Sequence, residues 1–393
     1  MLVMGMSSKK HQIPAIRFKG FTDAWEQRKL GDIADIKDSA RISNELWVEN
    51  GIPYLRSSDL VNGELNGELF ISKETYEGYA SKTGAPQKDD VLFTSGGKVG
   101  VVYHKKDESP VYVQGGAVLY VKTSTSNLLD GSFLSIYFGS PRMQTYMDIA
   151  SSGGTIKHFT LKPANASPII FPGLSEQQKI GAFFKELDKT IALHLCKQRQ
   201  LELLKQRLIK EILPQSDSTL PHLRFANFRK PWEQHQLKEV LKVNSGRDYK
   251  HLNEGNIPVY GTGGYMLSVD GKLSDVDGIG LGRKGTIDKP QYLKAPFWTV
   301  DTLFYLTPSP NYDIYFLYTL IQNVNWKSMD ESTGVPSLSK SVIERVTLTF
   351  PILEEQQKIG SFFREFDNTI SLHQQKIAHL KALKSTILNK MFI

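Results

Sequence analysis

One segment of this chain occurs twice, and the duplication limits the possible folds more than any other feature. The first copy reads LSEQQKIGAFFKELDKTIALH from Leu174 to His194, and the second reads LEEQQKIGSFFREFDNTISLH from Leu353 to His373. The match continues without gaps as far as Leu213 in the first copy. Self-similarity over such a length marks a repeated structural unit.

A second, shorter repeat lies upstream of each copy. PAIRFKGFTDAWEQRKL begins at Pro14, and PHLRFANFRKPWEQHQL begins at Pro221. The chain is therefore a leading segment, a variable region and a long segment, followed by the same three parts again. The polar stretch PQSDSTLP, residues 214–221, joins the two halves and is bounded by prolines, which end helices.

The long segments are predicted to be helices with one apolar face. Residues 175–213 contain no proline and one glycine, and Ser175 with Gln178 is typical of a capping box. Apolar residues recur in steps of four and three, which is a heptad seam. The predicted seam comprises Ile180, Phe184, Leu187, Ile191, His194, Gln198, Leu201, Lys205, Leu208 and Ile212, and in the second copy Ile359, Phe363, Phe366, Ile370, His373, Ile377, Leu380, Lys384, Ile387 and Met391.

Nearly forty helical residues span about 60 Å. Two such helices in one chain most simply bury their seams against each other, as an antiparallel intramolecular coiled coil. His194 and His373 occupy equivalent seam positions, and we interpret them as residues that fix the register. A metal site is the weaker interpretation, because no Cys, Asp or Glu completes a ligand set. Cys196 is expected to lie on the surface of its helix or to pack against neighbouring side chains.

The variable regions are predicted to be mixed α+β domains. Glycine, threonine, tyrosine and valine form short alternating runs, as in DVLFTSGGKVGVVYHK from Asp90. Gly280, Gly282 and Gly285 match the dinucleotide-binding fingerprint, but Pro290 follows too soon for a helix. The run TSGGKVG lacks the spacing of a phosphate-binding loop. The glycines with Arg283 and Lys284 better suit an approach to a phosphate or a base edge.

Charge and cysteine content restrict the class of protein. The net charge of +7 and a pI of about 9.1 favour an anionic partner. A single cysteine excludes an internal disulfide and fits a reducing compartment, and no run is long and apolar enough for a membrane helix. We therefore expect a cytoplasmic protein. The common hydrolase and methyltransferase motifs are missing, which favours a binding protein over an enzyme.

Basic and aromatic residues cluster in the predicted loops, where most could equally be solvated surface charges. The candidate DNA-contacting residues are Arg56, Ser57, Lys98, Lys157 and His158 in the first region, and Arg247, Tyr260, Thr262, Arg283 and Lys284 in the second.

The chain resembles the specificity subunits of Type I restriction–modification systems. The matching motifs are the two long-segment starts, the domain beginnings DAWEQRKLGDIADI and KPWEQHQLKEVLKV, and GGTIKHFTLKPANASPIIFP at the end of the first domain. IPVYGTGGY, GLGRKG and FWTVDTLFYL in the second domain are also typical. The resemblance covers nearly the whole chain from about Arg17.

The resemblance implies a DNA-reading scaffold without catalysis of its own. Each target recognition domain would read one part of a split DNA sequence, and the paired helices would set the spacing. Two modification subunits would dock and methylate adenine with S-adenosylmethionine. Restriction subunits, which use ATP and magnesium, would join them for host defence. No cofactor or metal is expected in this chain itself.

The implied organisation has six parts. They are a disordered leader (1–15), target recognition domain 1 (16–170), long spacer helix 1 (171–213), a linker (214–222), target recognition domain 2 (223–349) and long spacer helix 2 (350–393). Two alternatives stay open. One is a nucleic-acid-binding coiled-coil adaptor without sequence preference, and the other is an enzyme, such as a nuclease or a nucleotide-dependent oxidoreductase.

Overall fold

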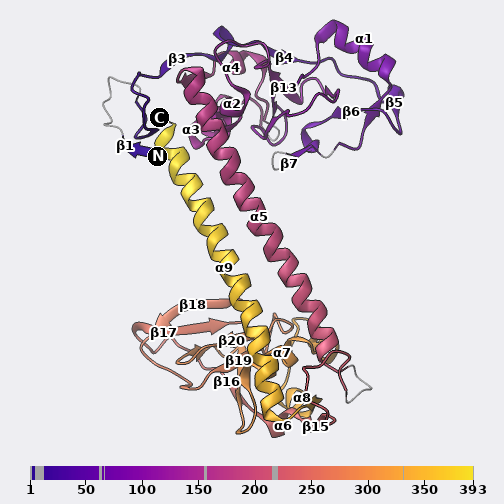
Figure 1. Ribbon diagram of the computed structural model, residues 1–393, viewed down its shortest axis with the longest axis vertical. Helices are drawn as coiled ribbons and strands as arrows, with labels where there is room; N and C mark the ends of the chain where they lie inside the picture. The colour runs from indigo at the N-terminus through magenta and orange to yellow at the C-terminus, as the bar shows by residue number, and fades with distance from the viewer. Residues whose placement is uncertain are drawn as a thin grey trace. The chain divides into compact units, whose positions relative to one another are not determined.

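The duplicated segments form two 39-residue helices, α5 (Leu174–Ile212) and α9 (Leu353–Met391), as Figure 1 shows. The structure is a computed structural model that describes residues 2–4, 13–61, 64–65, 67–154, 157–214, 220–330 and 332–392. The chain divides into two units. Unit 1 is Met1–Leu193 with Ile377–Ile393, and unit 2 is His194–Lys376, so each unit contains part of both helices.

The helices pair through the predicted heptad seam in an antiparallel manner. In unit 1, Ile180 and Phe184 near the start of α5 share one apolar core with Ile387 near the end of α9. Lys384 Nζ of α9 also donates to Asp188 Oδ1 of α5 at 2.5 Å. Unit 2 contains the equivalent ion pair between Lys205 and Asp367, at 2.6 Å. The predicted coiled coil is confirmed in both units.

The predicted N-cap of α5, Ser175, is wrong by two positions, because the residue before the helix is Gly173. The helix begins at Leu174, and the backbone N–H groups of Glu176 and Gln177 donate to Gly173 O at 3.0 and 3.1 Å. The Gln177 side chain ties this helix start to the preceding chain, because its Nε2 donates to Pro172 O at 2.7 Å. The equivalent bond in α9 joins Gln356 Nε2 to Pro351 O at 2.8 Å.

Unit 1 contains two four-stranded sheets. The first has the order β11-β10-β13-β4 and is antiparallel throughout. The second has the order β12-β6-β9-β5, in which β6 pairs antiparallel with β9 and parallel with β12. The strands are β4 (Ile36–Asp38), β5 (Trp47–Val48), β6 (Ile52–Leu55), β9 (Phe70–Ile71), β10 (Val91–Thr94), β11 (Val102–His104), β12 (Tyr112–Val113) and β13 (Val118–Val121), with the small pairs β7–β8 (Leu60–Val61, Glu64–Leu65) and β3–β14 (Glu26–Lys29, Pro168–Phe171).

Unit 2 repeats this topology with different residues. Its first sheet has the order β20-β19-β22-β16, and its second has β18-β17-β21, in which β17 pairs antiparallel with β18 and parallel with β21. The strands are β16 (Leu241–Ser245), β17 (Glu254–Gly261), β18 (Gly264–Val269), β19 (Gly278–Gly282), β20 (Gln291–Leu293), β21 (Trp298–Thr299) and β22 (Leu303–Pro308), with the pair β15–β23 (Glu233–Gln236, Thr347–Phe350). The two variable regions are therefore one fold used twice, and the predicted α+β class is confirmed.

Short helices complete each unit and connect its sheets to the long helices. In unit 2, Gly360 of α9 lies against the start of α7, where a Cβ would come within 2.2 Å of Asp313 Oδ1. Gly181 of α5 lies against α2 of unit 1 in the same manner. The single glycine of each long segment is thus required for close packing. The helices are α1 (Lys73–Thr83), α2 (Gly131–Phe138), α3 (Pro141–Ala150) and α4 (Leu161–Asn165) in unit 1, and α6 (Leu237–Val240), α7 (Ile314–Gln322) and α8 (Lys340–Arg345) in unit 2.

The leading segments anchor each unit to the start of a long helix. Arg17 Nε and Nη2 donate to the two carboxylate oxygens of Glu176, both at 2.7 Å, and both side chains are buried. Arg224 makes the same bidentate contact with Glu355. In each half, the shorter repeat is thus tied to the start of the long repeat by a buried ion pair.

The leader, residues 1–15, was expected to be disordered, and the part of it that the structure describes differs from this expectation. Within the leader expected to be disordered, Leu2–Met4 form strand β1, which pairs antiparallel with β2 (Ile16–Phe18). The rest of that leader up to residue 12 lies outside the described residues, as do residues 215–219 of the linker.

Candidate nucleic-acid interface

Loops from both sheets of unit 1 meet around one turn, residues 114–117, which follows β12. Gln114 N donates to Leu55 O at 2.8 Å, so the turn lies beside the loop after β6. Ser95 N donates to Ala117 O at 2.8 Å, and Gly116 N donates to Asp38 Oδ1 at 3.0 Å. The loops that follow β4, β6 and β10 therefore converge, and we call this convergence the unit 1 cradle.

Several predicted contact residues lie in the unit 1 cradle. His158 forms a β-bridge with Gly96, in the loop that carries Lys98. A Cβ at the next residue, Gly97, would lie 3.8 Å from Ser57 Oγ. Ser57, Lys98 and His158 are far apart in the sequence, and the fold brings them to one surface.

The cations of this cradle differ in availability. Arg56 Nε and Nη2 donate to Asp59 at 3.1 and 3.0 Å, and the hydrogen bond with Asp59 raises the pKa of Arg56. Lys157 pairs with Asp148. Lys98 is exposed and has no ion pair among the residues that the structure describes. Of these three, Lys98 is the freest to meet a phosphate.

Unit 2 builds the same convergence around residues 300–302, after β21. Val300 N donates to Tyr260 O at 3.0 Å, which joins the turn to the end of β17. Arg283 N and Lys284 N both donate to Thr302 O, at 2.8 and 3.3 Å. We call this the unit 2 cradle.

The five residues predicted in the second region all lie at the unit 2 cradle. Arg247 N donates to Thr299 O at 2.8 Å, and Gln291 Nε2 donates to Thr262 O at 3.2 Å. The Arg283 guanidinium lies 5.7 Å from the centre of the Phe304 ring. Arg247, Arg283 and Lys284 are exposed, and none of them has an ion pair within the described part of the chain.

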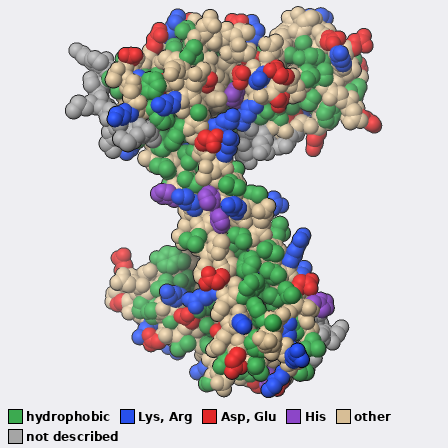
Figure 2. All heavy atoms as spheres, viewed as in Figure 1, with side chains coloured by type: hydrophobic (Ala, Val, Ile, Leu, Met, Phe, Trp, Pro, Cys, Tyr) green, Lys and Arg blue, Asp and Glu red, His purple; other side chains and the backbone are tan. Residues whose placement is uncertain are grey.

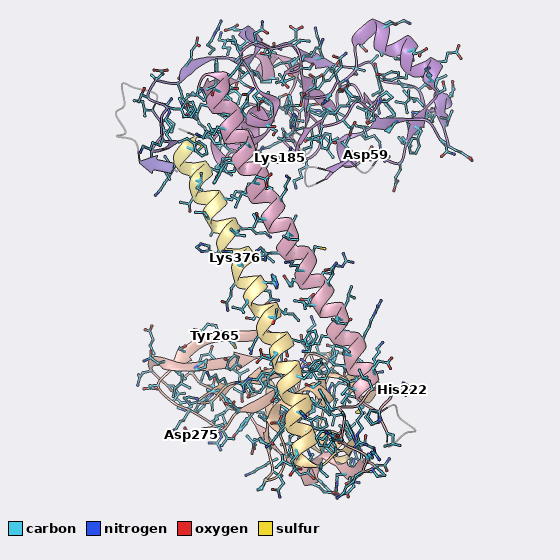
Figure 3. All side chains as sticks on the ribbon, viewed as in Figure 1. Asp59, Lys185, His222, Tyr265, Asp275 and Lys376 are labelled. Atoms are coloured by element: carbon cyan, nitrogen blue, oxygen red, sulfur yellow. The ribbon has the colours of Figure 1, made fainter. Side chains whose placement is uncertain are left out.

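The β17–β18 hairpin adds aromatic surface to this cradle. Burial raises the pKa of Tyr260, whose ring lies 6.4 Å from that of Tyr265. Tyr265, labelled in Figure 3, is 62% exposed, and Met266 beside it is 49% exposed. Large exposed apolar side chains next to unpaired cations are typical of nucleic-acid-binding surfaces.

The two cradles share a pattern of backbone hydrogen bonds and differ in their side chains. In unit 1, Ser95 N donates to Ala117 O, just before β13, and Ser95 O accepts from Phe159 N. In unit 2, Arg283 N donates to Thr302 O, just before β22, and Arg283 O accepts from Leu338 N. By this register Gly96 corresponds to Lys284, and His158 corresponds to Ser337. A fixed frame therefore presents two different sets of side chains.

The central turn of unit 1 was missed by the sequence analysis. Its Gln114-Gly115-Gly116 lies between two short strands, and a Cβ at Gly115 would lie 1.8 Å from Ser39 O. A Gly-Gly pair between alternating runs is a turn signal. Nothing local shows, however, that the turn meets residues far away in the sequence.

Comparison with known proteins identifies the family. The family model for the Type I restriction modification DNA specificity domain matches residues 22–203 and 229–382. The chain belongs to this Type I DNA-specificity family.

Individual relatives agree with this membership. The chain is 32% identical over 81 residues to the Type I restriction enzyme MjaVIII specificity subunit of Methanocaldococcus jannaschii. That match spans 20% of this chain and only 19% of the relative's length.

Two solved structures share the fold at low sequence identity. The crystal structure of the Type I restriction–modification S subunit from M. genitalium has a TM-score of 0.72 and 18% identity, and the match covers 97% of this chain and 99% of that one. A second structure, from work on complex assembly and conformational transition of the Type I system, has a TM-score of 0.54 and 16% identity, with 94% and 97% covered.

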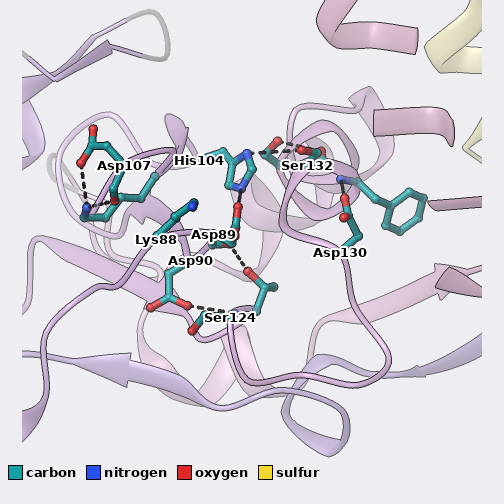
Figure 4. A network of polar contacts seen from close by, with 12 residues as sticks. Lys88, Asp89, Asp90, His104, Asp107, Ser124, Asp130 and Ser132 are labelled. Atoms are coloured by element: carbon teal, nitrogen blue, oxygen red, sulfur yellow. Dashed lines mark hydrogen bonds and ion pairs between the residues drawn. The ribbon is translucent and has the colours of Figure 1, made fainter. Parts of the chain in front are cut away.

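Other groups in this Type I specificity chain have structural explanations. Figure 4 shows His104 between Asp89 and Ser132, an order that resembles a hydrolase triad. The distances are 3.4 and 3.5 Å, and burial lowers the pKa of His104 against the opposing effect of Asp89. In unit 2, Tyr292 takes the same strand position and donates to Asp277 at 2.5 Å. We interpret both contacts as fixing the strand edge.

The glycine run of the second region does not form a dinucleotide site. Gly278–Gly282 are strand β19, and a Cβ at Gly282 would lie 2.1 Å from Thr286 O. No helix follows these glycines directly, so a phosphate-binding helix start is not formed. The oxidoreductase alternative therefore loses its motif.

The seam histidines form a close pair. His194 Nδ1 lies 2.8 Å from His373 Nδ1, so one ring donates and the other accepts. Desolvation lowers the pKa of His194, and the charge of the neighbouring His373 lowers it further. The described residues contain no cluster of three or more His, Cys, Asp or Glu suited to a metal, and none of their helices is long and apolar enough to cross a membrane.

Proposed function

We propose that this chain reads a split DNA sequence, with one cradle for each part, and acts as a non-catalytic scaffold in the cytoplasm. The observation that carries this is the pair of cradles with one backbone and two side-chain sets. A shared frame supports a shared way of meeting the duplex. Different side chains support different base sequences, because base edges carry the sequence information.

The charges at the cradles support contact with DNA. Arg247, Arg283 and Lys284 supply unpaired cations in unit 2, and Lys98 does so in unit 1. Figure 2 shows basic and acidic side chains interspersed over the face in view, so the net positive charge is not gathered into one large patch there. Each cation that neutralises a phosphate adds about 0.9 to the slope of log affinity against log salt.

The partner part of the proposal rests on a stripe of side chains that both helices share, in which the lysines, glutamates and leucines are exposed and the phenylalanines are half-buried. Beside the buried seam, α5 presents Lys179, Phe183, Glu186, Thr190 and Leu193, and α9 presents the same five types at Lys358, Phe362, Glu365, Thr369 and Leu372. Leu193 and Leu372 are 53% and 64% exposed. Folding alone leaves exposed positions free to vary, because substitutions there change stability little.

Several exposed positions outside the stripe have changed, although Gln178 and Gln357 are identical. Ala182 corresponds to Ser361, and Lys189 corresponds to Asn368. A shared line of identical side chains supports two equivalent docking sites for one partner. We propose that two modification subunits occupy them, bring S-adenosylmethionine and methylate adenine. Restriction subunits with ATP and magnesium would complete the assembly for host defence.

Methylome sequencing tests the proposal directly. A host that expresses this chain with its modification subunits should acquire one split adenine-methylated motif. Exchange of residues 22–165 for those of a related chain should change one half of that motif only. An active complex that methylates no defined motif would leave only a nucleic-acid adaptor without sequence preference.

Partner stoichiometry has a separate test. Leu193→Asp should remove one modification subunit from the complex in native mass spectrometry, and Leu193→Asp with Leu372→Asp should remove both. Leu195→Asp is the matched control, because Leu195 is 44% exposed, lies off the stripe and corresponds to Gln374 in the other helix. Retention of both partners by the double variant would contradict the docking assignment.

A further inference from the structure

A second concave surface adjoins the unit 1 cradle, and none of the predicted contact residues line it. It is an open cavity of about 480 Å³ lined by Arg41, Ile42, Ser43, Asn44, Trp47 and Gln114. Gln114 belongs to both surfaces, because it begins the central turn of the cradle. The cavity is therefore a continuation of the face that we propose meets DNA.

The loop that carries Arg41 is held rigidly on both sides. Ala40 N donates to Tyr112 Oη and Ile42 N donates to Tyr54 Oη, both at 3.1 Å. The two tyrosines are fully buried, and their rings stack with centres 6.3 Å apart. The backbone around Arg41 is thus fixed before any ligand arrives, which reduces the entropy lost on binding.

The same loop is joined to the cradle through Asp38. One carboxylate oxygen of Asp38, Oδ1, accepts from Ser39 N at 2.9 Å and from Gly116 N at 3.0 Å. The loop and the central turn therefore keep a constant relation. A duplex seated on the turn would meet Arg41 at a defined position.

The polar side chains of the cavity are the types that read base edges. Arginine pairs with guanine O6 and N7, and asparagine and glutamine pair with adenine N6 and N7. Arg41, Asn44 and Gln114 make no side-chain hydrogen bond or ion pair among the described residues. Trp47 is 37% exposed and lies 6.2 Å from the Tyr54 ring, so it offers a fixed apolar wall for a thymine methyl group.

Unit 2 has the opposite charge at the corresponding place. In the first sheet of unit 1, Asp38 pairs with Leu119, and in the first sheet of unit 2, Ser245 pairs with Phe304. Asp38 and Ser245 are therefore equivalent positions. Three residues further along are Arg41 in unit 1 and Asp248 in unit 2. Arginine and aspartate prefer different base edges, so this loop position separates the specificities of the two cradles.

We propose that this cavity is a base-reading site, in which Arg41, Asn44 and Gln114 recognise base edges of the DNA half-site that unit 1 contacts. The inference rests on the proposed DNA-reading function and assigns part of its specificity. The ligand is the major-groove edge of double-stranded DNA, with guanine and adenine as the bases that these side chains recognise.

The test uses the full complex with its modification subunits and methylome sequencing as the readout. Arg41→Ala, Asn44→Ala and Gln114→Ala should each relax one or two positions in one half of the motif. The preference for the original base should fall roughly 5- to 150-fold, and the other half should stay unchanged. Arg28→Ala, at a half-exposed arginine on β3, is the matched control and should leave both halves intact.

The outcomes separate this inference from the proposed function. A split motif in the wild type that Arg41→Ala, Asn44→Ala and Gln114→Ala all leave unchanged would overturn the base-reading site alone. A uniform loss of methylation with the motif preserved would also overturn it, since that indicates phosphate contact or lost stability. Thermal unfolding of each variant identifies the latter. Absence of any motif in the wild type would refute the proposed function itself.

Discussion

Replacement of Arg17 by methionine should destabilise unit 1 strongly and locally. The Arg17 and Glu176 side chains are 6% and 2% exposed and share two hydrogen bonds of 2.7 Å. Removal of one partner from a buried ion pair costs about 3–5 kcal/mol, because the other charge stays buried. Arg17 Nη1 is itself buried without a partner, and its removal relieves a cost, so we expect about 3 kcal/mol.

Hydrogen exchange with mass spectrometry measures this effect in each unit separately. Peptides that cover residues 14–30 and 174–190 should exchange about 100-fold faster in the variant, whereas peptides of unit 2 keep their rates. Arg17→Met with Glu176→Leu should recover most of the loss, because an apolar pair needs no compensation. Arg28→Met, at a half-exposed position, should change stability by less than about 0.5 kcal/mol. A single variant no worse than this control would refute the argument.

Three further predictions concern binding, pH and packing. Arg283→Ala and Lys284→Ala should each weaken DNA binding by the complex and reduce the salt slope by about 1, as measured by fluorescence anisotropy at several salt concentrations. Because the pKa of His194 is lowered in the folded state, stability should be full above its ordinary value of about 6.5 and fall as the pH drops below it. Thermal unfolding of His194→Gln with His373→Gln should lose this dependence between pH 7.5 and 5. Gly360→Ala should cost about 1–3 kcal/mol by urea unfolding, because its Cβ would meet Asp313 Oδ1 at 2.2 Å, and a neutral result would contradict the close packing.

The sequence predicted the long helices well because their signal is local. A heptad spacing is visible in any window of the segment, and residues such as Ile180 and Ile359 are buried as that spacing requires. The duplication also showed that Lys205 and Lys384 are equivalent. It did not show that each pairs with an aspartate of the opposite helix, Asp367 or Asp188, since that depends on the register between distant segments.

The contact surfaces were predictable only in part. Arg283 and Lys284 were found because glycines surround them, and a glycine loop with two cations is a local pattern. Arg41 and Gln114 carried no such pattern and were missed. They became candidates because buried tyrosines and a crowded glycine turn hold them on one face.

The sequence by itself thus determined that the chain is two copies of one plan, with matching helices that each carry one heptad seam. Periodicity and repetition require only neighbours along the chain, so they can be read without a fold. The tertiary structure alone decided which loops meet, because strands that pair across a sheet come from far apart in the sequence. The two cradles, and the different side chains on their common frame, follow from that pairing.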